Sequence, residues 1–78
     1  MATLRLFAGA REAAGTGVDQ IDGDTVGAIL DAAVERYGSA FADVLASSRT
    51  WVNGEQAERS DVVGDGDEVA VLPPVSGG

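Results

Sequence analysis

The sequence DGDTVGAILDAAVERYG, residues 22–38, decides the expected fold, because it carries an apolar stripe at helical spacing. The stripe consists of apolar residues three and four positions apart, namely Val26, Ile29, Leu30, Ala33, Val34 and Tyr37. Asp24 or Thr25 is suited to cap the start of this helix, and Gly38 is suited to end it. A helix with one apolar face needs one sheet face to cover.

Strand patterns precede this helix. Residues 3–8 alternate, with Leu4, Leu6 and Ala8 on one parity, as in a half-buried strand. Residues 9–17 are rich in Gly and Ala, and a second strand is expected near residues 18–21. The simplest connection is a hairpin, with residues 9–17 as its loop.

Residues 39–48 leave two structures open. Phe41, Val44 and Leu45 fall at helical spacing, but the segment is short. A single loose turn and a second small helix are both compatible with it.

Two further strands follow. Thr50-Trp51-Val52 precedes Asn53-Gly54, a pair that tolerates the positive φ angles of a tight hairpin turn. Residues 68–72 form the last expected strand, and Pro73-Pro74 ends it because proline has no N–H for a sheet ladder. The order strand, strand, helix, strand, strand predicts a compact α+β roll in a single domain, residues 1–78.

The charge and composition exclude several classes of function. Thirteen acidic residues against five basic ones give a formal charge of -8, which repels nucleic acid and anionic membranes. The excess favours either basic partners or simple solubility. No signal peptide or long apolar run is present, so we expect a cytoplasmic protein.

Common catalytic side chains are also missing. All five basic residues are arginine, and the chain has no His, Lys or Cys. These are the usual proton shuttles, nucleophiles and transition-metal ligands. We therefore expect no catalysis by side chains of this chain, no bound metal and no bound cofactor.

The end of the chain, Pro73-Pro74-Val75-Ser76-Gly77-Gly78, is hard to explain by stability, because terminal glycines contribute no side-chain contact. We expect residues 73–78 to form a flexible, extended tail. A stiff di-proline base and a thin end suit delivery of the Gly78 carboxylate into a narrow partner channel. Such a carboxylate can be adenylated and then attacked by sulfur, which leaves a C-terminal thiocarboxylate.

Two residues near the first strand are candidate partner contacts. Phe7 lies on the parity opposite Leu4 and Leu6, so it is either an exposed interface aromatic or packed under residues 39–48. Arg11, followed by Glu12, is either a partner contact or half of a solvated surface pair.

Taken together, these motifs resemble the MoaD/ThiS family of ubiquitin-like, β-grasp sulfur carriers, most closely the small subunit of molybdopterin synthase. The resemblance spans nearly the whole chain and rests on a few motifs, namely Phe7-Ala8, Arg11-Glu12, Gly15, Asn53-Gly54, residues 66–69 and residues 73–78. It implies a β-grasp fold with a mixed sheet of four to five strands and one main helix. Leu72 departs from the pattern, because many such subunits carry phenylalanine there.

The resemblance also implies a cycle of reactions. An E1-like adenylyltransferase uses ATP to adenylate Gly78, a sulfur donor protein converts it to the thiocarboxylate, and the molybdopterin synthase large subunit passes the sulfur to cyclic pyranopterin monophosphate. The chain is then the sulfur-donating subunit, and the large subunit supplies the catalytic side chains. The implied partner contacts are Phe7, Arg11, Leu72, Pro73, Pro74, Val75, Ser76 and Gly77.

Three other functions remain open from the sequence. The sulfur acceptor can belong to cysteine or thiamin synthesis, because carriers for these pathways share the fold and the Gly-Gly end. Gly78 can instead join the chain to lysines of other proteins, as in a ubiquitin-like modifier. Finally, the chain can be an interaction domain with an inert tail.

Overall fold

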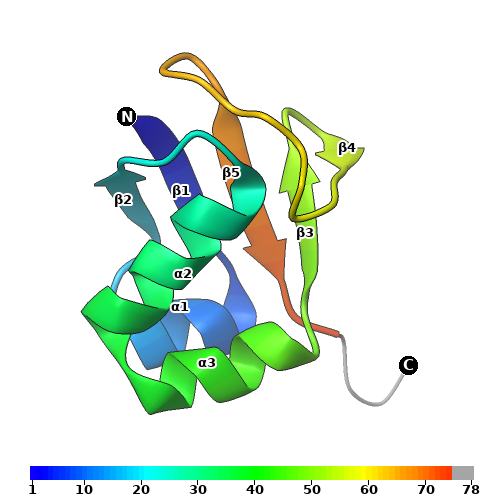
Figure 1. Cartoon of the computed structure of the whole chain (residues 1–78). Helices are drawn as coiled ribbons and strands as arrows, with labels where there is room; N and C mark the ends of the chain where they lie inside the picture. Colours follow the sequence, from blue (N-terminus) through cyan, green and yellow to red (C-terminus); the bar gives the residue numbers. More distant parts are fainter. Residues whose placement is uncertain (75–78) are drawn as a thin grey trace.

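The computed structural model describes residues 1–74, so the predictions for Val75, Ser76, Gly77 and Gly78 lie outside the described residues. This part of the chain forms five strands and three helices (Figure 1). In order, they are β1 (Ala2–Leu6), α1 (Ala8–Ala14), β2 (Val18–Ile21), α2 (Val26–Tyr37), α3 (Ser39–Ala46), β3 (Arg49–Val52), β4 (Glu55–Gln56) and β5 (Glu68–Leu72).

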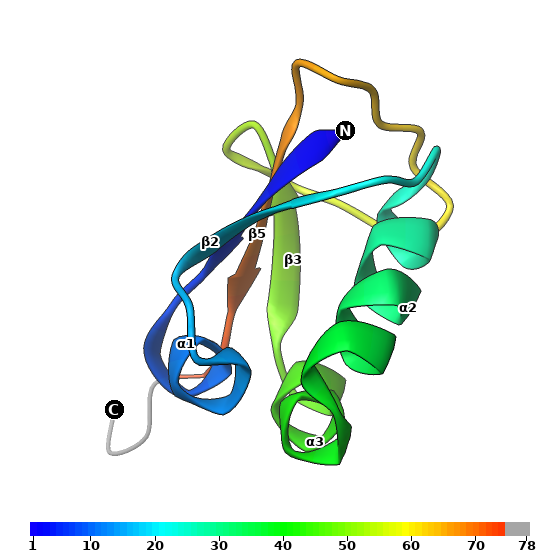
Figure 2. The same cartoon turned by 90° about the vertical axis from the view of Figure 1, so that its left-hand side faces the viewer.

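The strands form one mixed sheet in the order β2-β1-β5-β3-β4. The two central strands, β1 and β5, are parallel, and the other neighbours are antiparallel. Figure 2 shows α2 and α3 along one face of the sheet, with α1 closing one end, while the other face carries no helix. The predicted α+β class and the mixed sheet are confirmed.

The core lies between the sheet and α2, as the apolar patterns predict. Alternate residues of β1 and β5 are buried, namely Ala2, Leu4, Leu6, Val69 and Val71. The stripe of α2 meets them with Val26, Ile29, Leu30 and Ala33. Thr25 caps α2, because its Oγ1 accepts a hydrogen bond from the Ala28 N–H at 3.1 Å.

The prediction of a loop at residues 9–17 is wrong, since most of this segment is α1. The first strand correspondingly ends at Leu6 rather than Ala8. Alanine is the best helix former and occupies four of the seven positions of α1, and Ala10 is fully buried. Gly15 then ends the helix with φ of 78°. The antiparallel pairing of β1 and β2 is confirmed, but a helix connects them.

Residues 39–48, which the sequence left open, form mainly the helix α3. Phe41 anchors it, with no exposed surface. The Phe41 ring meets the Tyr37 ring edge to face, with centroids 5.2 Å apart. The fold therefore has one main helix, α2, and two shorter ones that the sequence patterns did not specify.

The hairpin turn between β3 and β4 is confirmed. Asn53 and Gly54 both have positive φ angles, 50° and 86°. The Asn53 side chain also joins the turn to β5, donating to Asp67 and accepting from the Glu68 N–H, each at 2.9 Å.

Replacement of the turn glycine provides a test of this geometry. Gly54→Ala should lower the free energy of unfolding by about 1 kcal/mol, because an L-residue is strained at this φ. Gly64→Ala is the matched control, because Gly64 has no atom within 4 Å of an added Cβ and no such φ. Urea unfolding that shows equal losses for both variants would contradict the assigned turn.

One edge of the sheet is the strand β2, and side chains cover its outward backbone groups. The backbone groups of Val18 and Gln20 that point away from β1 all have side-chain partners. The Thr16 hydroxyl donates to the Val18 carbonyl and accepts from the Val18 N–H. The Asp19 side chain accepts from the Gln20 N–H at 2.8 Å, and Arg36 donates to the Gln20 carbonyl at 3.2 Å. A sheet edge satisfied in this way is protected from pairing with another strand.

Asp19 also joins this edge to the end of α2. Its Oδ2 accepts hydrogen bonds from the Tyr37 hydroxyl and from Arg36. Hydrogen bonding by Tyr37, and then by Arg36, lowers the pKa of Asp19. Burial, reinforced by Asp19, raises the pKa of Tyr37 to about 12.

The Tyr37 pKa predicts a loss of stability at alkaline pH. The folded state holds the phenolic proton to about pH 12, whereas the unfolded state releases it near 10.0. Unfolding then releases a proton, so the free energy of unfolding should fall as pH rises through this interval. Tyr37 is the only tyrosine, and the chain has no lysine or cysteine, so tyrosinate absorbance reads its titration directly.

In the Tyr37→Phe variant, this component of the pH dependence should disappear. If the pH midpoint of tyrosinate absorbance in the folded protein were close to the pKa of free tyrosine, the described burial and hydrogen bonding of the Tyr37 hydroxyl would be contradicted.

Candidate functional site at the base of the tail

The predicted contact residues gather at the end of the sheet where β5 finishes. Because β1 and β5 are parallel and Leu6 pairs with Val71, their carboxyl ends lie side by side. Phe7 follows β1 and is 44% exposed, and Leu72 ends β5 and is 39% exposed. Of the two alternatives for Phe7, the structure therefore supports the one in which its ring is exposed, next to the start of the tail.

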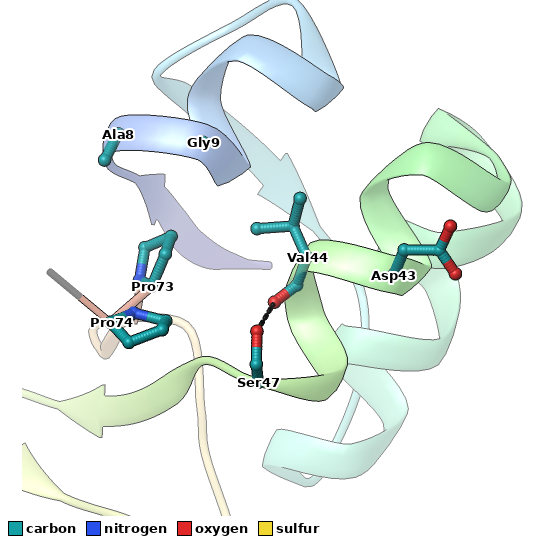
Figure 3. Close-up of a pocket in the computed structure, with 7 residues that line it drawn as sticks. All are labelled: Ala8, Gly9, Asp43, Val44, Ser47, Pro73 and Pro74. Carbon is teal, nitrogen blue, oxygen red and sulfur yellow. Dashed lines mark hydrogen bonds between the residues drawn. The ribbon is translucent and has the colours of Figure 1, made fainter. Parts of the chain in front are cut away.

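Pro73 and Pro74 continue from β5 and separate two hollows in the surface. The first, which we call the helical hollow, is lined by Ala8, Gly9, Asp43, Val44, Ser47, Pro73 and Pro74, and its volume is about 600 Å³. Figure 3 shows both prolines facing the start of α1 and the end of α3. The two helices pack closely here, since a Cβ added at Gly9 would make an ordinary contact of 3.7 Å with a Val44 methyl group.

The second hollow, which we call the tail groove, lies on the β3 side of the prolines. It is lined by Ser47, Arg49, Trp51, Leu72, Pro73 and Pro74, and its volume is about 260 Å³. Arg49 pairs with Leu72 and Trp51 pairs with Ala70 in the sheet register. These four residues have the parity opposite the buried Val69 and Val71, so the groove opens on the sheet face that carries no helix.

Arg11 lies in a different place. It is exposed on α1 and lines a third hollow with Glu12, Gly15, Thr16 and Gly17. This hollow shares only Ala8 with the helical hollow. The structure thus brings together Phe7, Leu72, Pro73 and Pro74, but it does not place Arg11 in either hollow beside the prolines.

Several residues at the tail base were not predicted as site residues, namely Asp43, Val44, Ser47, Arg49 and Trp51. Three of them lie on or just after α3, whose structure the sequence left open. Trp51 could have been found from strand alternation, because its neighbours Thr50 and Val52 pair with the buried Val71 and Val69. No sequence signal marks Arg49.

The ion pairs of the described region divide the five arginines into two groups. Three of the five arginines have a carboxylate oxygen within 3 Å, in the pairs Arg5–Glu68, Arg36–Asp19 and Arg59–Asp31. Within residues 1–74, neither Arg11 nor Arg49 has an acidic side chain within ion-pair distance. The same part of the chain contains no group of acidic residues arranged to hold a metal ion, and none of its helices is long and apolar enough to cross a membrane.

A comparison with known protein families decides to which family the chain belongs. The model of the ThiS family matches residues 4–78, from β1 to the last glycine. The chain belongs to the ThiS family. It is therefore a ubiquitin-like protein of the sulfur carrier type, as the sequence motifs indicated.

Individual relatives and solved structures match nearly the whole chain. Small archaeal modifier protein 1 of Haloferax volcanii is 36% identical over 84 residues, covering 95% of this chain and 97% of the relative. Its crystal structure matches with a TM-score of 0.83 over 99% of this chain and 98% of that one. This structural match confirms the β-grasp, ubiquitin-like fold.

Two further solved structures come from differently named proteins. The putative molybdopterin converting factor, subunit 1, from Pyrococcus furiosus is 26% identical, with a TM-score of 0.83, covering 95% of this chain and 97% of that chain. A chain of the Amycolatopsis orientalis BexX/CysO complex is 25% identical, with a TM-score of 0.84 and full coverage of both chains. The similar proteins thus include one named as a modifier and one named as a molybdopterin converting factor subunit, both with this fold.

Proposed function

We propose that this chain is the sulfur-donating small subunit of molybdopterin synthase, with Gly78 as the site of adenylation and thiocarboxylation. The observation that carries the proposal is the sequence that follows β5, where Pro73-Pro74 is followed, after two residues, by Gly77-Gly78. The family match extends to that terminus, and the relative from Pyrococcus furiosus bears a molybdopterin-related name.

The proposed chemistry begins at the Gly78 carboxylate. A carboxylate oxygen attacks the α-phosphorus of ATP in the activating enzyme, and pyrophosphate leaves. A sulfur nucleophile from a donor protein then attacks the acyl carbon, and AMP leaves. When that nucleophile is a persulfide of the donor, the product is an acyl disulfide, and a second thiol of the donor then cleaves the sulfur–sulfur bond. The donor is left as a disulfide, and Gly78 keeps the outer sulfur as a thiocarboxylate. Glycine leaves its carbonyl open to attack because it has no Cβ.

The composition supports a division of labour between subunits. The chain has no His, Lys or Cys, so proton transfer and sulfur handling fall to partner proteins. A buried terminal anion must be paired, which favours a basic pocket in the large subunit. ATP is used by the activating enzyme, and this chain needs no cofactor of its own.

The test is sulfur transfer in a purified system. Thiocarboxylated protein, mixed with the large subunit and cyclic pyranopterin monophosphate, should yield molybdopterin while its terminus returns to the carboxylate. If the thiocarboxylate persists with this acceptor but is consumed by a cysteine-synthesis or thiamin-synthesis enzyme, the pathway assignment is wrong and the carrier chemistry stands.

A second candidate is a ubiquitin-like modifier joined through Gly78 to lysines of other proteins. The 36% identity to small archaeal modifier protein 1 favours it. The absence of lysine means that an activated Gly78 cannot be captured by a side-chain amine of its own chain. Isopeptide-linked Gly78 peptides in digests of cell extract would support this function, and adducts lost on thiol treatment would not.

A further inference from the structure

The Asn53-Gly54 pair of the hairpin turn carries the reacting groups of a deamidation. When the backbone nitrogen of Gly54 attacks the side-chain carbonyl carbon Cγ of Asn53, a five-membered succinimide ring forms. The side-chain NH2 group leaves with the Gly54 amide proton as ammonia. Water then opens the ring at one of its two carbonyls, which yields aspartate or isoaspartate at position 53. Glycine favours the attack because no Cβ shields its nitrogen.

The folded structure holds the Asn53 carboxamide away from this reaction. Its Nδ2 donates to Asp67 Oδ1 and its Oδ1 accepts from the Glu68 N–H, each at 2.9 Å. We call these two hydrogen bonds the Asn53 clamp. Ring closure requires Cγ to approach the Gly54 nitrogen, so the carboxamide must leave both partners. Asn53 and Gly54 are exposed, so the clamp, and not burial, restrains the reaction.

The clamp lies at the end of the sheet where β5 begins, opposite the end where Pro73 follows β5 (Figure 1). Asp67 is its centre, because Oδ2 of the same carboxylate accepts from the Gly64 N–H at 2.8 Å. Hydrogen bonding by Asn53, and then by Gly64, lowers the pKa of Asp67, so its side chain is an anion at neutral pH. An anionic carboxylate is a strong acceptor for the Asn53 NH2 group. It would repel a carboxylate at position 53.

We propose that Asn53 is a deamidation site that the Asn53 clamp keeps slow, and that it reacts when the turn between β3 and β4 separates from β5. The aspartate product cannot re-form the clamp, because it has no N–H to donate to Asp67. Two like charges would instead face each other across the former hydrogen bond. The modification thus turns a contact that joins the hairpin to β5 into one that separates them. This proposal does not depend on which partner uses Gly78.

The rate of the reaction can be followed at this one residue. Asn53 is the only asparagine, and tryptic cleavage after Arg49 and Arg59 places it in the peptide 50–59. Mass spectrometry of the digest measures the replacement of NH2 by OH, and fragment ions locate it at Asn53. The free 50–59 peptide should deamidate about a hundredfold faster than folded wild type, because it lacks both hydrogen bonds of the clamp. Asp67→Ala should deamidate about tenfold faster than wild type, because it lacks one.

Asp65→Ala is the matched control for Asp67→Ala. Asp65 lies in the same turn and carries the same charge, but its carboxylate accepts from the Met1 amine. This variant should deamidate at the wild-type rate. Equal rates for the two variants, or a wild-type rate equal to that of the free peptide, would overturn the proposal.

A reciprocal exchange tests the charge argument without the reaction. Asn53→Asp should lower the folding equilibrium constant about tenfold, because aspartate tolerates the turn but cannot donate to Asp67. Adding Asp67→Asn to Asn53→Asp restores one donor and one acceptor, so the double variant should recover most of this loss. Gln56→Glu makes the same charge change at an exposed position of β4 and should stay within about twofold of wild type. Urea unfolding measures all three, and a double variant no more stable than Asn53→Asp would contradict the clamp.

Discussion

Deletion of Gly78 should abolish thiocarboxylate formation and molybdopterin synthesis while leaving the domain folded. The carboxyl group of the deleted variant would belong to Gly77, one residue too short to reach an active site built for Gly78. The hydrogen-bonded sheet and the buried core lie within residues 2–72, so the free energy of unfolding should not change measurably. Mass analysis of the product and urea unfolding measure these two properties.

Two matched variants make the Gly78 experiment decisive. One extra alanine after Gly78 should be equally inactive, because the reactive group is the terminal carboxyl of Gly78 itself. Gly64→Ala should react like wild type, because Gly64 lies in an exposed turn with no atom near an added Cβ. Full sulfur transfer by the deletion variant would refute Gly78 as the working residue.

The largest effect on folding is expected for Phe41→Ala. Phe41 is the largest of the fully buried side chains and packs edge to face on Tyr37. Removal of a buried phenylalanine costs about 3–5 kcal/mol, from the lost burial and the cavity left behind. A domain of this size is stable by about 4–12 kcal/mol, so the variant should be largely unfolded in low concentrations of urea.

The control for Phe41→Ala is an apolar truncation on the surface. Val62 is 79% exposed, and Val62→Ala should change the free energy of unfolding by less than about 0.5 kcal/mol. If the two variants were equally stable, α3 would not be held by Phe41 as described. Because α3 leads into Ser47, which lines both hollows, Phe41→Ala should also weaken partner binding in the fraction that stays folded.

The sequence predicted the parts of the fold whose patterns are long or chemically specific. The stripe of α2 covers three turns and has a capping Thr25, and the Asn53-Gly54 turn requires residues that tolerate positive φ. The segment forming α1 misled because Gly9 and Gly15 bracket an alanine-rich run with little amphipathic pattern. Helix propensity and burial of Ala10 decided its structure.

Only those features of the candidate site that depend on short stretches of sequence could be predicted. The terminal motif is a local feature of the sequence. Strand parity left Phe7 either exposed or packed under residues 39–48, and the structure shows it exposed just after β1. Arg49 and Asp43 come to the tail base through the pairing of β3 with β5 and through the placement of α3. Those contacts join positions far apart in the sequence, so no local pattern specifies them.

The most direct measurement is the intact mass of the protein after incubation with its E1-like adenylyltransferase, ATP and a sulfide source. The predicted result is a mass gain equal to the replacement of one oxygen by sulfur, located at Gly78 and absent without ATP. An unchanged mass, with an enzyme shown to be active, would contradict the assignment of Gly78 as a sulfur-carrying terminus.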